Sequence, residues 1–155
     1  SWEVIKAEER VDRRDNPQQK IEISVLDGIA KTLPSLLAAL KIQQRAALTG
    51  FDWAEIKPVI DKIEEELGEL RIEIAQDGSP RKMEEELGDL LFACVNLGRH
   101  LNTNAEVALR RANQKFERRF RRVEALMGSL ESDENENSLD AMQTFWEQAK
   151  LEEGN

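Results

Sequence analysis

The chain has 155 residues, of which 34% are charged and 40% hydrophobic, and its formal net charge is -9. This length suits one domain, spanning residues 1–155, with a single hydrophobic core. The acidic balance argues against a general affinity for nucleic acid or for an anionic membrane. Few aromatic residues, 8 Gly and 4 Pro favour helices over a turn-rich β fold, so we expect an all-α protein.

The chain has a single cysteine, Cys94, and a single histidine, His100. They allow neither an intramolecular disulfide nor a Cys/His zinc site, and a reducing cytoplasm fits this composition. We expect no membrane partner, because no stretch approaches the roughly 18 apolar residues of a bilayer span. Residues 2–6 already follow a helical pattern with no cap before them, which indicates a fragment of a longer protein.

The first well-marked helix is predicted from Pro34 to Leu48, where apolar residues recur at helical spacing before a stop at Gly50. Asp52 is predicted to cap the next helix. Glu55, three residues later, would complete a capping box. An apolar stripe over residues 56–74 then indicates a long amphipathic helix.

The stretch Asp77 to Pro80 interrupts that stripe, since Ser79 can cap a new helix and Pro80 suits its first position. A second apolar seam follows, so a helical hairpin is predicted. Thr103 is expected to cap a basic helix that runs to about Met127. Residues 131–137 are acidic and indicate a flexible loop before a short last helix. Apolar stripes of this size predict a four-helix-bundle type of core that a homodimer completes.

A nine-residue pattern occurs in both arms of the hairpin: KIEEELGEL at residues 62–70 and KMEEELGDL at residues 82–90. Positions three apart on a helix lie on nearly the same face. Glu66 with Glu69, and Glu86 with Asp89, therefore each present two neighbouring carboxylates.

Counting from Gly78 places these acids at matching heights on the two arms. Glu69 is nine residues before the turn and Glu86 eight after it, while Glu66 is twelve before and Asp89 eleven after. An offset of one residue is only about 1.5 Å of helix rise. Four close carboxylates require compensating cations, and oxygen ligands suit Mg²⁺, with Mn²⁺ as a possible substitute.

The acids allow two other interpretations. They can form the solvated face of a hairpin, although this leaves unexplained Gly68 and Gly88 at matching mid-helix positions, where each costs roughly 1 kcal/mol. A ferritin-like di-iron bundle needs Glu-x-x-His motifs, and His100 is single.

The segments EEELGEL and EEELGDLLFACVNLGRHL resemble the ExxE and ExxD motifs of the MazG nucleoside triphosphate pyrophosphohydrolases, an all-α family. The stretches SVLDGIAKTLPSLLAALKIQQRAALTGFDW and RRANQKFERRFRRVE resemble the C-terminal, catalytic domain of longer bacterial MazG proteins. The resemblance implies Mg²⁺-dependent hydrolysis of a nucleoside triphosphate to the monophosphate and pyrophosphate, by attack of water on the α-phosphorus.

The same resemblance implies roles for individual residues. The acids Glu66, Glu69, Glu86 and Asp89 would be the catalytic metal ligands. The substrate-binding residues would be Lys62, Glu65, Lys82, Glu85, Lys115, Arg119, Trp146 and Lys150.

Simpler roles remain open for several of these residues. Lys62 and Lys82 can pair with Glu66 and Glu86 at i,i+4, and Trp146 can anchor the last helix. For the whole chain, the alternative to an enzyme is a non-catalytic helical module that binds a nucleotide or a partner protein.

Overall fold

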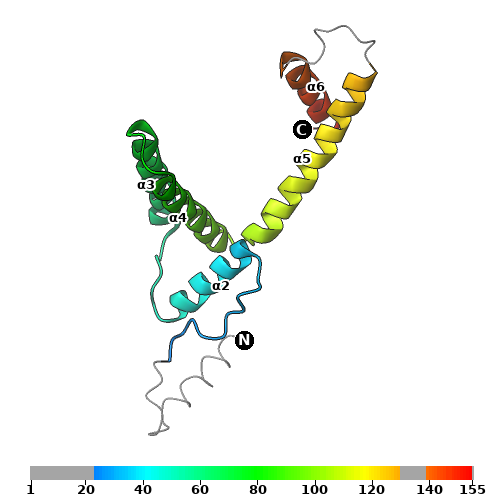
Figure 1. The fold of residues 1–155 in the computed structure, drawn as a ribbon. Coiled ribbons are helices and arrows are strands. Elements are labelled where there is room, and N and C mark those ends of the chain that lie inside the picture. The colour runs from blue at the N-terminus through cyan, green and yellow to red at the C-terminus, as the bar shows by residue number, and fades with distance from the viewer. Residues whose placement is uncertain (1–22, 130–138, 155) are drawn as a thin grey trace. The chain divides into compact units, whose positions relative to one another are not determined.

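The computed structural model describes residues 23–129 and 139–154, and in these ranges every regular element is a helix (Figure 1). The all-α prediction is confirmed for this part of the chain. The helices are α2 (Ser35–Leu48), α3 (Ile56–Ala75), α4 (Pro80–His100), α5 (Ala105–Gly128) and α6 (Leu139–Glu152). Among these described helices none is long and apolar enough to cross a membrane. The expectations for residues 2–6 and for the loop at 131–137 fall outside the described residues.

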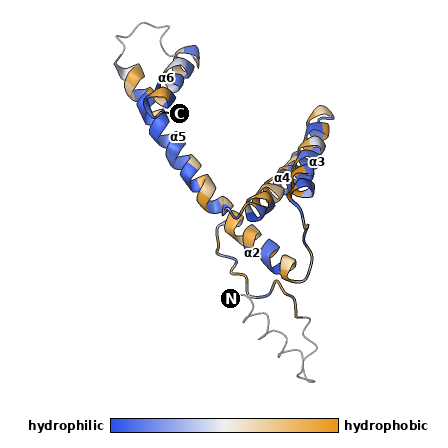
Figure 2. Cartoon of the chain, turned by 180° about the vertical axis from the view of Figure 1, so that it is seen from behind, coloured by the Kyte–Doolittle hydropathy of each residue, from blue (hydrophilic) through white to orange (hydrophobic). Residues whose placement is uncertain are grey.

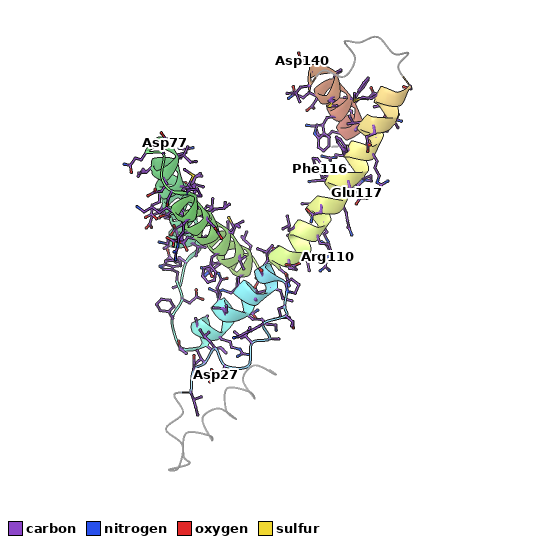
Figure 3. All side chains as sticks on the ribbon, viewed as in Figure 1. Asp27, Asp77, Arg110, Phe116, Glu117 and Asp140 are labelled. Carbon is purple, nitrogen blue, oxygen red and sulfur yellow. The ribbon has the colours of Figure 1, made fainter. Side chains whose placement is uncertain are left out.

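Helices α3 and α4 form the predicted hairpin and pack along each other. Asp77 lies at the turn (Figure 3) and has a positive φ of 48°. Ser79 caps α4 through its hydroxyl oxygen, which accepts a hydrogen bond from the backbone N–H of Lys82 at 3.3 Å. Pro80 then occupies the first turn of α4. The turn chemistry predicted from residues 77–80 is therefore confirmed.

Helix α2 packs against α4, and the chain reverses after it at Gly50, which has a φ of +91°. Only glycine adopts this conformation readily, so the predicted stop is confirmed. Arg45 is buried on α2 and donates to the backbone carbonyl of Asp27. This bond ties the segment before α2 to the helix.

The capping box predicted at Asp52 is wrong. Helix α3 begins at Ile56 without a side-chain cap, while Asp52 accepts two hydrogen bonds from Arg99, at 2.6 and 2.9 Å. His100 lies 3.0 Å from the same carboxylate. Arg99 holds the pKa of Asp52 well below its usual range. A bidentate guanidinium is a stronger partner than a helix N–H group, so a residue 47 positions away displaces the local cap.

The cap predicted at Thr103 lies one residue too early. Asn104 accepts a hydrogen bond from the backbone N–H of Glu106 at 2.9 Å, and α5 begins at Ala105. The physical reason is that Gly98 and Thr103 close the end of α4, where the Thr103 N–H donates to the Gly98 carbonyl at 2.8 Å.

The described chain divides into two compact units, one ending at Glu106 and the other beginning at Val107. Val59 and Val95 are fully buried in the first unit, and Val123 in the second. Many large apolar side chains of the hairpin stay exposed, and Figure 2 shows hydrophobic positions along both of its helices. They include Ile56, Ile60, Leu67, Ile72, Ile74, Leu87, Leu91 and Phe92.

Candidate functional site

Three of the four predicted acids come together across the hairpin. Glu66 of α3 and Glu86 and Asp89 of α4 each offer a carboxylate oxygen, and these oxygens lie within 4.8 Å of one another. Glu66 and Asp89 are the residues that the count from Gly78 places level. The side chain of Glu66 is only 7% exposed, so its charge is largely removed from water.

Within the described residues, two oxygens of this cluster lack hydrogen-bond partners. Glu66 Oε2 and Glu86 Oε2 are buried, and no hydrogen-bond donor within the described residues reaches them. A buried carboxylate oxygen without a donor or cation is costly. The donor set is oxygen only, which suits a hard divalent cation. The cluster can therefore hold a metal ion.

Glu69 lies beside the cluster rather than within its closest three acids. Its pKa is raised, chiefly by hydrogen bonding with Glu86 and then by the charge of Glu66. Glu69 and Glu86 are thus neighbours across the hairpin, at the heights that counting predicts. The structure places Glu69 where a fourth carboxylate can join the other three.

The two repeated lysines have different partners. Lys62 lies 2.9 Å from Glu66 and 3.1 Å from Glu65, and the pKa of Lys62 is raised chiefly by Glu66. The i,i+4 pairing considered for this lysine is therefore present. Lys82 instead lies 4.0 Å from Glu73, because the first turn of α4 faces the last turns of α3. The prediction that Lys82 pairs with Glu86 in the same way is wrong, since Lys82 lies beside Glu73 instead.

Glu85, the counterpart of Glu65, also has a different neighbour. Its carboxylate lies 3.5 Å from Arg81 in a largely exposed i,i+4 pair. Both members of this pair are accessible to water, so it contributes little to stability.

The predicted phosphate and nucleotide contacts lie in the second unit, on α5 and α6. Arg119 is 8% exposed, and its Nε donates to Glu153 at 2.8 Å. The Trp146 ring lies 5.3 Å from the ring of Phe116 and 6.0 Å from the Arg119 guanidinium carbon. The structure thus brings Arg119 and Trp146 together.

Two lysines flank this group. Lys115 is exposed on α5, and Lys150 pairs with Glu147 on its own helix at 2.9 Å. The pKa of Glu153 is lowered to about 2 because Arg118 and Arg119 both donate to it. The roles of these residues in binding a substrate stay predictions.

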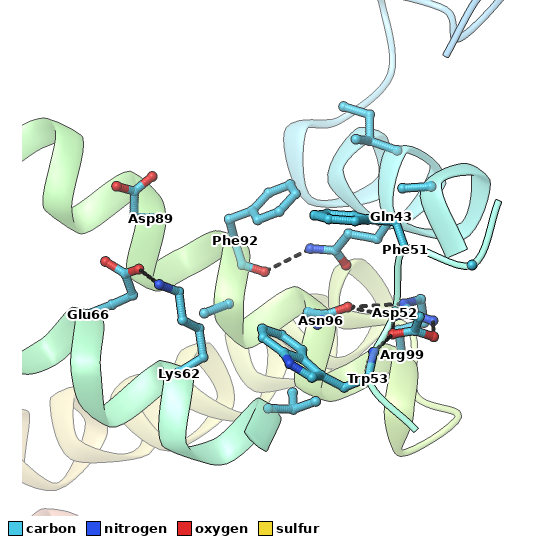
Figure 4. Close-up of a pocket in the computed structure, with 15 residues that line it drawn as sticks. Gln43, Phe51, Asp52, Trp53, Lys62, Glu66, Asp89, Phe92, Asn96 and Arg99 are labelled. Carbon is cyan, nitrogen blue, oxygen red and sulfur yellow. Dashed lines mark hydrogen bonds and ion pairs between the residues drawn. The ribbon is translucent and has the colours of Figure 1, made fainter. Parts of the chain in front are cut away.

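A pocket of about 630 Å³ lies beside the carboxylates in the first unit (Figure 4). Lys62, Glu66 and Asp89 line one end of it. Gln43, Trp53 and Phe92 line it further along. Sequence reasoning did not single out these last three residues, although they lie in the stretches that resemble the MazG family, because nothing local distinguishes them from ordinary polar and apolar positions.

The fold and the acids define a helical-hairpin protein with a cluster of carboxylates that can hold a metal ion. Residues 55–124 match the MazG nucleotide pyrophosphohydrolase domain. The matched residues include both copies of the repeated acidic pattern and most of α5.

Curated relatives extend the similarity over nearly the whole chain. A nucleoside triphosphate pyrophosphohydrolase of Escherichia coli (strain K12) is 48% identical over 153 residues, which are 98% of this chain and 56% of the relative. The nucleoside triphosphate pyrophosphohydrolase/pyrophosphatase MazG of Thermotoga maritima is 40% identical over 149 residues, 96% of this chain and 54% of the relative. The chain thus spans about half the length of these two relatives. Its place as the C-terminal part of a longer protein stays a prediction.

Proposed function

We propose that the chain hydrolyses nucleoside or deoxynucleoside triphosphates to monophosphates and pyrophosphate. The observation that carries this proposal is the cluster of Glu66, Glu86 and Asp89, with two buried oxygens that have no described partner. The names of the Escherichia coli and Thermotoga maritima relatives support the same reaction. We prefer this function to a non-catalytic binding module, because the relatives named above are pyrophosphohydrolases and the buried, unpartnered carboxylate oxygens suit a metal ion.

Glu66, Glu86 and Asp89, joined by Glu69, would hold Mg²⁺, for which Mn²⁺ can substitute. When bound, the cation neutralises charge on the triphosphate and lowers the pKa of a bound water. One carboxylate of the group takes the proton from the water that attacks the α-phosphorus. The bond to the β-phosphate then breaks, and pyrophosphate leaves.

Cationic side chains complete the proposal. Lys115 and Arg119, one turn apart on α5, would bind the phosphates, and Trp146 and Lys150 would contact the nucleotide. Arg119 is already held by a carboxylate, Glu153, and a phosphate oxygen is an acceptor of the same kind. In the first unit, the substrate-binding set would also include Lys62, Glu65, Lys82 and Glu85.

We also propose that the protein is a cytoplasmic homodimer. A second copy would cover the exposed apolar side chains of α3 and α4 named above. Large exposed apolar patches mark interaction surfaces. A molar mass twice that of the chain, measured by light scattering, would support this assembly, and a monomer would contradict it.

The reaction is tested by incubating the chain with Mg²⁺ and a nucleoside triphosphate and measuring pyrophosphate and monophosphate. We expect both products from the unmodified chain. Glu66→Gln and Asp89→Asn should lose at least a hundredfold in rate. The matched controls Glu64→Gln and Glu84→Gln remove exposed carboxylates of the same two runs and should keep activity. Release of orthophosphate and the diphosphate would refute the proposal, and a folded but inactive chain would favour the binding module.

A further inference from the structure

The pocket beside the carboxylates extends along one face of α4. Asp89, Phe92, Ala93, Asn96 and Arg99 all line it, and their spacing of threes and fours keeps them on one side of a helix. At about 1.5 Å per residue, Asn96 lies ~10 Å further along the axis than Asp89. Figure 4 shows the same order, with the acids at one end and Asn96 and Arg99 toward the other.

The middle of this pocket suits an uncharged ring. Among its lining residues the cations are Lys62 and Arg99. Lys62 is paired with Glu66, and Arg99 holds Asp52 through two hydrogen bonds. Both cations are thus already paired with carboxylates. The part of the pocket away from Glu66 and Asp89 therefore has no unpaired cation among its lining residues to neutralise a phosphate. The walls between them carry the rings of Phe51, Trp53 and Phe92.

Gln43 brings an unsatisfied acceptor to this pocket. The residue is 6% exposed, and its Nε2 donates to the Phe92 carbonyl at 2.9 Å. A carbonyl can only accept, so this bond fixes which side of the amide carries the nitrogen. Gln43 Oε1 is left buried without a hydrogen-bond partner in the described chain. A ligand N–H at this point would remove the cost of the orphaned oxygen.

Asn96 brings a donor to the same pocket. Its Oδ1 accepts from Nε of Arg99 at 3.1 Å and from a terminal nitrogen of the same guanidinium at 2.8 Å. These bonds leave the amide NH₂ of Asn96 as a donor. The pocket thus combines one acceptor, one donor and aromatic rings. Proteins read a nucleobase with this combination, by hydrogen bonds to its edge and stacking on its faces.

We propose that this pocket binds the nucleobase of the substrate, with Gln43 Oε1 and Asn96 Nδ2 reading its edge and Trp53 and Phe92 contacting its faces. The proposal rests on the proposed function for the placement of the triphosphate at the carboxylates. The volume of about 630 Å³ lies within the usual range of small-molecule sites. Gln43 and Asn96 are then specificity residues, distinct from the residues that hold phosphate.

A binding experiment tests the location without requiring turnover. The ¹⁵N-labelled full chain is titrated with the α,β-methylene analogues of ATP, GTP, CTP and UTP in the presence of Mg²⁺. We expect the side-chain amide signals of Gln43 and Asn96 and the indole signal of Trp53 to shift. Shifts of the Trp146 indole with these three signals unmoved would place the base on α6 and overturn the proposal.

A substitution tests the reading of the base. Asn96→Asp keeps an acceptor oxygen for Arg99, removes the NH₂ donor and adds one negative charge. We expect the ratios of kcat/KM among the four nucleoside triphosphates to change by tenfold or more. Gln44→Glu adds the same charge at an exposed position of α2 and should leave these ratios unchanged. Thermal unfolding of both variants verifies that they are folded.

The two proposals fail differently. Pyrophosphate release with unmoved pocket signals and unchanged base ratios would overturn the base pocket and leave the reaction standing. Shifted pocket signals without any pyrophosphate release would support the base pocket and overturn the reaction. Unmoved signals together with no pyrophosphate would overturn both.

Discussion

The ammonium group of Lys62 lies 2.9 Å from a carboxylate oxygen of Glu66. The lysine side chain is partly exposed, whereas the glutamate side chain is only 7% exposed. A second pair on the same helix, Lys57 with Asp61, has a similar distance of 2.7 Å, but both of its side chains are more than half exposed. The two pairs therefore differ in how far water solvates both side chains, and only in the first pair is the acid buried.

Lys62→Met should lower the free energy of unfolding of the metal-free chain by about 1–3 kcal/mol, because it leaves a buried carboxylate without its cation. Lys57→Met, the matched control, should change it by less than about 0.5 kcal/mol. Urea denaturation in the presence of a chelator measures both values. Equal effects in the two variants would mean that the burial of Glu66 does not matter.

Magnesium should stabilise the chain against unfolding through Glu66, Glu86 and Asp89. A ligand at one hundred times its dissociation constant adds about 2.7 kcal/mol, so the thermal midpoint should rise with Mg²⁺ and fall when a chelator is added. Glu86→Gln should remove most of this rise. Glu84→Gln changes an exposed acid two residues earlier in the same acidic run, on another face of α4, and should keep it. The same rise in Glu86→Gln as in the unmodified chain would contradict a metal centre here.

The hairpin and the positions of its acids were predictable because they depend on sequence signals between residues close together in the chain. The repeat at residues 62–70 and 82–90 gives the helix faces, and the turn signals at Ser79 and Pro80 give the register between the arms. Counting from the turn then places Glu66 level with Asp89. Each of these steps depends only on residues close in sequence and on the constant rise of a helix.

The parts that sequence missed depend on contacts distant in sequence. The local sequence around Asp52 is typical of a helix cap. In the fold, Arg99, 47 positions later, donates hydrogen bonds to both of its carboxylate oxygens. Gln43 has the form of an ordinary polar residue on α2. Only the fold shows that its NH₂ group donates to the Phe92 carbonyl, 49 positions away, and that its Oε1 has no hydrogen-bond partner in the described chain. No local pattern encodes such partners.

The contact between α5 and α6 should weaken in acid. The folded-state pKa of Glu153, about 2, lies below its ordinary value of 4.5 because Arg118 and Arg119 donate to it. A lowered pKa contributes stability that is complete above about pH 4.5 and is lost as the pH falls toward 2. The NMR indole signal of Trp146, on α6 shortly before Glu153, reports this change.

A matched pair of variants separates Glu153 from acid effects elsewhere. Glu153→Gln should reduce the shift of the Trp146 signal between pH 4.5 and 2, since the titrating carboxylate is gone. Glu147→Gln removes an exposed acid that pairs within α6 only and should keep the full shift. An unchanged titration in Glu153→Gln would show that another group governs the contact.

Two glycines of α4 should respond in opposite directions to alanine. A Cβ at Gly88 would meet nothing within 4 Å in the described chain, whereas a Cβ at Gly98 would lie 2.9 Å from the backbone oxygen of Thr103. Gly88→Ala should therefore raise the free energy of unfolding by about 0.5–1 kcal/mol through helix propensity. Gly98→Ala should lower it, because backbone must shift at the end of α4. Urea denaturation measures both, and a loss at Gly88 as large as that at Gly98 would show that another chain packs against this position.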